Sequence, residues 1–94
     1  MINKFYVKST DVIAFPTHGG ISLHHLKSDE YYSMEEGVAS FVWDYLDGSN
    51  TIETIINNIS KQFAVDDIEI GEDIVEFINN LIENKLIIEV IDRI

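Results

Sequence analysis

Hydrophobic and polar positions alternate over short runs in the first third of the chain, which is the spacing expected of strands. The runs cover residues 5–7, 12–15, 21–26 and 30–33. Glycine-containing or polar segments at 16–20 and 27–29 separate the last three runs and favour turns. Because such short turns join neighbouring strands, we predict a small antiparallel meander.

From residue 33 onward the apolar positions recur at helical spacing, and three capping signals mark the helix starts. In each signal a Ser, Asn or Asp is followed three residues later by Glu, a pair that can satisfy two unpaired backbone donors. The pairs are Ser33/Glu36, Asn50/Glu53 and Asp66/Glu69. They predict helices over about 34–46, 51–63 and 67–84, and residues 86–91 then read as a terminal strand.

The three predicted helices differ in how their apolar residues are distributed. Helix 34–46 is apolar around most of its circumference and should be central. Helix 51–63 has one core-facing stripe, made of Ile52, Ile55, Ile56, Ile59 and Phe63. Helix 67–84 has a stripe of its own, made of Ile70, Ile74, Phe77, Ile78 and Leu81.

Beside the stripe of helix 67–84 lies a second apolar flank of Ile68, Val75 and Ile82. This flank either completes the core or forms the wall of an apolar groove. Three polar residues would give such a groove an acidic lip: Glu72, Asn79 and Glu83.

The order of elements defines the expected fold class. The length of 94 residues fits one domain, over residues 1–94. We predict an α+β, winged-helix-like domain: a three-stranded antiparallel sheet followed by three helices and a short C-terminal strand. The segment 30–33 would be an edge strand without a proline, so an extended peptide could pair with it. The alternative is an edge covered only by water.

The charge excludes some classes of partner. Seventeen acidic residues face only six basic ones, for a net charge of −11. Such a surface repels nucleic acid and anionic membranes, and it favours a basic or neutral partner. The basic residues are also scattered along the chain: Lys4, Lys8, Lys27, Lys61, Lys85 and Arg93. Equally, the acidic residues could serve only to keep a small protein in solution.

No pattern typical of catalysis or of a metal site is present in the sequence. The chain has no cysteine, no nucleophile elbow and no phosphate-binding loop. His24 and His25 are adjacent in a predicted strand and therefore point to opposite faces. We expect no enzyme activity, metal or cofactor. The absence of a signal peptide and of an apolar span predicts a soluble protein, which we expect to be cytoplasmic.

A set of motifs in residues 31–55 and 73–87 resembles the PqqD-like family. Residues 31–55 hold an aromatic strand, a helix with Trp43, the turn Leu46-Asp47-Gly48, and Thr51-Ile52-Glu53 at the next helix start. Residues 73–87 are similar to the family's third helix and the hydrophobic segment that follows it. The pattern departs from the family at Met34-Glu35, where Leu-Asn is usual, and the resemblance covers about 30–90.

The resemblance implies a recognition element for ribosomally synthesised, post-translationally modified peptides. Such domains are non-catalytic. A leader peptide adds as a strand between their third strand and third helix, and the domain presents the precursor to a maturation enzyme. The enzyme is a radical-SAM protein, a cyclodehydratase, or a leader peptidase of lasso-peptide pathways. By position, the implied peptide-binding residues are Glu30, Tyr31, Tyr32, Ser33, Glu72, Val75, Asn79 and Ile82. The alternative function is a winged-helix protein–protein adaptor or regulator.

Overall fold

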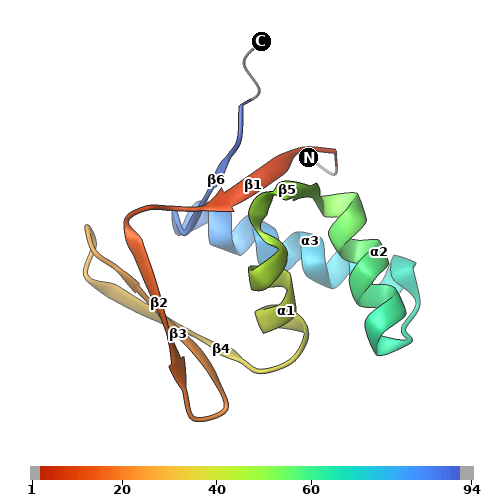
Figure 1. Cartoon of the computed structure of the whole chain (residues 1–94), viewed down its shortest axis with the longest axis horizontal. Coiled ribbons are helices and arrows are strands. Elements are labelled where there is room, and N and C mark those ends of the chain that lie inside the picture. The colour runs from red at the N-terminus through yellow and green to blue at the C-terminus, as the bar shows by residue number, and fades with distance from the viewer. Residues whose placement is uncertain (1–2, 92–94) are drawn as a thin grey trace.

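Two small antiparallel sheets and three helices make up the fold in the computed structural model, which describes residues 3–91 (Figure 1). One sheet has the strand order β2-β3-β4 and the other β5-β1-β6. The elements are β1 (Phe5–Lys8), β2 (Val12–Thr17), β3 (Gly20–His25), β4 (Glu30–Glu35), α1 (Val38–Tyr45), β5 (Asp47–Thr51), α2 (Ile52–Phe63), α3 (Asp67–Glu83) and β6 (Ile87–Glu89). The α+β class, with a three-stranded sheet, three helices and a C-terminal strand, is confirmed.

The predicted meander is confirmed for β2, β3 and β4. The β2–β3 turn has only two residues, since Thr17 pairs with Gly20, and Gly19 adopts a φ of 92° there. A side chain at Gly20 would collide with the carbonyl oxygen of Met34 on β4. Glycine at this position therefore allows β3 and β4 to approach each other.

The first strand does not join this meander. β1 instead pairs with β5 on one side and β6 on the other. β5 was not predicted, because its sequence DGSNT has neither alternation nor apolar residues. Its start is held by Asp47, whose Oδ1 accepts hydrogen bonds from the Ser49 backbone N–H (3.0 Å) and the Ser49 hydroxyl (2.6 Å).

Two of the three predicted capping residues were wrong. Helix α1 begins at Val38, because Ser33, Met34 and Glu35 are paired with β3 and Gly37 has a φ of 137°. The Ser40 hydroxyl, not Ser33, caps this helix: it accepts from the Gly37 N–H at 3.0 Å.

Helix α2 is capped by Thr51, one residue after the predicted Asn50. The Thr51 hydroxyl accepts from the Thr54 N–H at 3.2 Å. The Asn50 amide instead donates to the Tyr45 carbonyl. For α3 the predicted cap is confirmed, since Asp66 accepts from the Ile68 N–H at 2.8 Å.

The core lies where the three helices meet the two sheets. The predicted stripe of α2 is buried except at half-buried Phe63, and Ile74, Ile78 and Leu81 of α3 are buried as well. Leu23 of β3 is fully buried. Each such side chain stabilises the fold by about 1.5–3 kcal/mol. Trp43 of α1 is also buried, and the Lys8 ammonium lies 5.3 Å from its ring centroid.

None of the helices within residues 3–91 is both long enough and apolar enough to cross a membrane. Arg93, one of the six basic residues, lies outside the described residues.

Candidate functional site

The strand β4 lies at the edge of its sheet and carries unpaired backbone groups. Within residues 3–91 it has a strand neighbour only on the β3 side. The Glu36 N–H donates to the Gly19 carbonyl, one step beyond the ladder, at 2.9 Å. Backbone groups in an antiparallel pair alternate in direction, so even-numbered residues of β4 face β3. The N–H and C=O groups of Tyr31, Ser33 and Glu35 therefore point outward along the edge.

The side chains of β4 divide between the two faces of the sheet. Tyr32 and Met34 face the core, and Met34 is buried there. Tyr31 is on the other face, 62% exposed and stacked on His24 with ring centroids 4.2 Å apart. The His24 ring is itself held by Asp29, at 2.8 Å between Nε2 and Oδ1. This arrangement keeps the Tyr31 ring against the outer face and away from the edge.

One side-chain contact links β4 to the C-terminal end of helix α3. The Tyr32 hydroxyl is within hydrogen-bonding distance of Asn84 Oδ1 (3.4 Å), just after α3, and of Glu30 Oε1 (3.2 Å). Partial desolvation and, to a lesser extent, the Glu30 carboxylate raise the pKa of Tyr32 above its usual value. At its other end β4 leads within three residues into α1, which packs against α3. The strand therefore runs alongside α3, from its C-terminal end toward its N-terminal half.

An apolar hollow of about 300 Å³ lies between α1 and α3, close to where β4 enters α1. Asp73 contributes its only charged side chain. The lining residues are Val38, Ala39, Val42, Ile70, Asp73, Ile74 and Phe77. No residue of β4 lines this hollow, but β4 leads directly into the start of α1, which does. We use the name β4 cleft for the outward edge of β4 taken together with this hollow. It combines unpaired main-chain groups with a place for apolar side chains.

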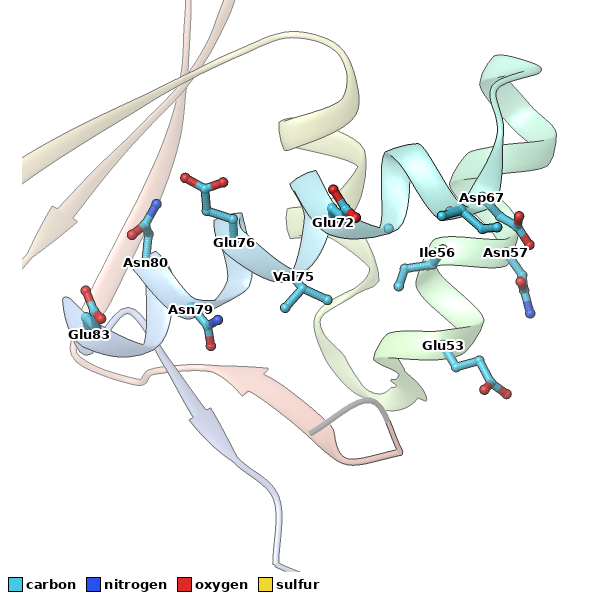
Figure 2. Close-up of a pocket in the computed structure, with 12 residues that line it drawn as sticks. Glu53, Ile56, Asn57, Asp67, Glu72, Val75, Glu76, Asn79, Asn80 and Glu83 are labelled. Atoms are coloured by element: carbon cyan, nitrogen blue, oxygen red, sulfur yellow. The ribbon is translucent and has the colours of Figure 1, made fainter.

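The residues predicted to bind peptide fall into separate places. Glu30, Tyr31, Tyr32 and Ser33 lie together in β4, as expected. The helix residues Glu72, Val75 and Asn79 instead line a larger hollow of about 840 Å³ between α2 and α3 (Figure 2). Ile82 lines a third hollow, with residues from the β1–β2 connection and β6 and with His25 and Lys27 at the end of β3. No hollow in the described part of the chain unites the strand residues with these helix residues.

Helical geometry explains this division. Two residues along a helix are about 200° apart around its axis, so Phe77 and Val75 face nearly opposite directions. Phe77 and Asp73 face α1, on the side where Asn84 contacts β4, whereas Val75 faces α2. Asp73 was not among the site residues predicted from the sequence. A signal was present, because Asp73 is a carboxylate set between the apolar positions Ile70, Ile74 and Phe77.

Within residues 3–91, no three His, Cys, Asp or Glu side chains lie close enough together to hold a metal ion.

Comparison with known proteins identifies the family. The sequence model of PqqD, described as coenzyme PQQ synthesis protein D, matches residues 20–87. The chain belongs to the PqqD family. The matched segment runs from the start of β3 to the first residue of β6, so it includes β4 and all three helices of this PqqD-family chain. A search of curated proteins gave no match.

Two solved structures share this PqqD-family fold. One is TbiB1 in complex with the TbiA(beta) leader peptide, with a TM-score of 0.79 and 23% identity over 92% of this chain and 99% of that one. The other is lasso peptide synthetase B1 complexed with the leader peptide, with a TM-score of 0.79 and 17% identity over 88% and 96% of the two chains. At these identities the likeness is one of fold.

Proposed function

We propose that this chain binds the leader of a ribosomally synthesised precursor peptide and presents it to a maturation enzyme, without catalysing a reaction itself. The observation that carries the proposal is the unpaired edge of β4 beside an apolar hollow in a PqqD-family chain. The two similar solved structures described above are complexes with a leader peptide, which supports the same class of ligand here. The enzyme would be one that modifies or cleaves the precursor, of one of the three kinds implied by the resemblance.

In this proposal the leader adds to β4 as a further strand. Its main chain bonds to the outward groups of Tyr31, Ser33 and Glu35, which supplies affinity without regard to sequence. Side chains of the added strand alternate between two faces. Those on the core side reach the hollow next to Phe77, so the hollow selects apolar leader residues at every second position. The acidic groups at the rim, Glu35 and Asp73 among them, favour a leader with basic residues beside the apolar ones.

The helix half of the proposed site differs from the one implied by the sequence. We place the leader against the face of α3 that holds Asp73 and Phe77, because that face lines the apolar hollow at the start of α1, into which β4 leads. The sequence-based site used Glu72, Val75, Asn79 and Ile82, the first three of which line the hollow between α2 and α3 instead. The two placements can be separated by substitutions at neighbouring positions.

The first test is a titration of the amide-labelled protein with the leader of a precursor peptide encoded beside it, followed by NMR. We expect shifts concentrated at residues 30–35 and along α3, with a dissociation constant below about 10 μM, or roughly −7 kcal/mol. Shifts absent from β4 at saturation would contradict strand addition. No binding to any neighbouring leader would contradict the proposed function.

The second step compares Asp73→Lys with Glu72→Lys. Both residues are exposed on α3 and both substitutions change the charge equally, but only Asp73 lines the β4 cleft. We expect Asp73→Lys to weaken leader binding by about tenfold or more and Glu72→Lys by less than about threefold. The reverse order would assign the leader to the Val75 side of α3. Thermal unfolding of both variants checks that each is folded.

A further inference from the structure

The hollow between α2 and α3 is a second candidate binding surface, on the other side of α3 from the β4 cleft. Its apolar floor consists of Ile56, Gly71 and Val75, and it ends at Ile68, which is 76% exposed. Its volume is about 840 Å³. We call it the α2–α3 groove. A concave surface of this volume with an apolar floor and polar groups around it is typical of a binding site.

The rim of the α2–α3 groove is acidic, and no basic side chain of the described residues neutralises its charge. Five carboxylates line it and no basic residue does: Glu53, Asp67, Glu72, Glu76 and Glu83. None of them takes part in an ion pair within residues 3–91. Figure 2 shows Glu72 and Glu76 on one side of the floor and Glu53 on the other. A ligand in the groove would therefore be flanked by negative charge on both sides.

Helix stability does not account for all of these carboxylates. Glu53 and Asp67 lie in first turns, where the helix dipole favours negative charge. Glu83, however, is the last residue of α3, where negative charge is disfavoured, and the last turn contains no basic residue. Glu72 and Glu76 are four residues apart, a spacing at which like charges repel. Three acidic residues thus lie where the isolated helix gains nothing from them.

The groove suits a helix better than an extended peptide. All of its lining residues belong to helices α2 and α3, and none of them belongs to a strand. An extended segment would find no main-chain partners and would leave its own N–H and C=O groups unpaired against the apolar floor. A helix satisfies these groups internally and can lay an apolar stripe into a groove. The 17 residues of α3 extend over roughly 25 Å, which is enough for several helical turns of a partner.

We infer that the α2–α3 groove docks an amphipathic helix of a partner protein, with leucine-like residues on Val75 and Ile56 and lysine or arginine residues facing Glu72, Glu76 and Glu53. Charge complementarity selects this occupant. A second copy of this chain, with its net charge of −11, would bring like charge to an acidic rim. The inference goes beyond leader binding and does not depend on it, since the two surfaces lie on different sides of α3.

The experiment uses a synthetic 18-residue helical peptide with a leucine stripe flanked by lysines, and the same peptide with glutamate in place of lysine. The full chain, labelled at backbone amides, is titrated with each. We expect the lysine peptide alone to bind, with shifts at residues 53–57 and 67–83 and none at 30–35. Equal binding of both peptides, or shifts outside the groove, would overturn the inference.

Matched charge variants complete the test. The double variant Glu72→Lys, Glu76→Lys should lower the affinity for the lysine peptide by at least about tenfold. The control is the double variant Glu36→Lys, Asp44→Lys, which makes an equal charge change at exposed positions outside the groove. It should change the affinity by less than about threefold. An equal loss of affinity in both double variants would show that the peptide is held only by nonspecific charge attraction, and it would overturn the inference. So would a dimer of the unliganded protein that Ile68→Ser dissociates. Leader binding that survives in the groove variant separates this result from the proposed function.

Discussion

The Asp47 carboxylate holds the turn between α1 and β5 through a single oxygen. Besides the two hydrogen bonds from Ser49, its Oδ1 accepts one from the Asn50 side-chain amide at 3.3 Å. The bond from the Ser49 hydroxyl, then that from the Ser49 backbone, lower the pKa of Asp47 below its usual value, and the charge of Lys8 adds a smaller effect. The ionised Asp47 carboxylate thus stabilises the turn at Leu46-Asp47-Gly48.

A pH-dependent loss of stability follows from this lowered pKa. The unfolded chain binds the proton of Asp47 more readily than the folded chain, so the stabilisation is present above the unfolded pKa and is lost as pH falls through the folded one. We expect Asp47→Asn to lower the thermal midpoint most at about pH 6–7 and progressively less below about pH 4. Circular dichroism at several pH values measures this difference.

Asp44→Asn is the control for this prediction. Asp44 is exposed on α1, and its side chain makes no hydrogen bond within the described residues. Its substitution should therefore leave the pH profile of the thermal midpoint close to that of the unchanged protein. A deficit of Asp47→Asn that stays constant across the whole pH range would contradict a role for the ionised carboxylate.

Two capping residues illustrate what local sequence could predict. Asp66 and Ser33 carry the same signal, a cap followed by Glu three residues later. Asp66 was predicted correctly, because nothing competes for its backbone. Ser33 pairs with Ser22 of β3, so its backbone is already part of a strand. The helix therefore begins only after Gly37. A local signal fails where a partner distant in sequence uses the same backbone.

At the scale of elements, β4 is a strand with one occupied and one unoccupied side. If the leader pairs with the outward groups, a proline at Ser33 should remove one donor that the leader needs. The ladder to β3 is made by the even-numbered residues and should persist, as edge strands tolerate proline in such positions. We expect Ser33→Pro to fold and to weaken leader binding by about tenfold or more, measured by isothermal titration calorimetry.

Ser33→Ala provides the control, because it keeps the backbone N–H and removes only the hydroxyl. It should bind the leader as well as the unchanged protein does. Equal binding by Ser33→Pro and Ser33→Ala, with both folded, would show that the main chain of β4 takes no part. Weaker binding by both would assign the contact to the Ser33 side chain.

Helix α3 shows which features of an element its sequence predicts and which it does not. Its spacing correctly predicted the buried face and an additional apolar flank, since the half-buried Val75 and the exposed Ile68 lie outside the buried stripe. Periodicity gives the angles between residues on one helix, but it does not give the rotation of that helix relative to a sheet. That rotation is set by tertiary contacts such as that between Tyr32 and Asn84. The side of α3 that faces β4 could therefore not be read from the sequence.

At the scale of the whole molecule, the negative charge is largely uncompensated. The described part of the chain has only three ion pairs, one of which depends on a histidine. The molecule measures 41 × 36 × 18 Å, so at low salt, where the screening length is about 30 Å, its field extends over its whole surface. At about 0.15 M salt the screening length falls to about 8 Å, and only charges close to a ligand still act on it.

This charge predicts how association should depend on salt. A leader with a net positive charge should associate more slowly as ionic strength rises from about 0.02 to about 0.5 M, by roughly tenfold or more, while its dissociation rate changes little. The reason is that long-range attraction acts on the encounter, whereas short-range pairing with β4 and the apolar hollow holds the bound peptide. Stopped-flow fluorescence with a labelled leader separates the two rates. A leader of the same length with glutamine in place of lysine should show almost no salt dependence of association. If both leaders respond equally, or if salt acts mainly on dissociation, the charge of this chain serves its solubility rather than the capture of a partner.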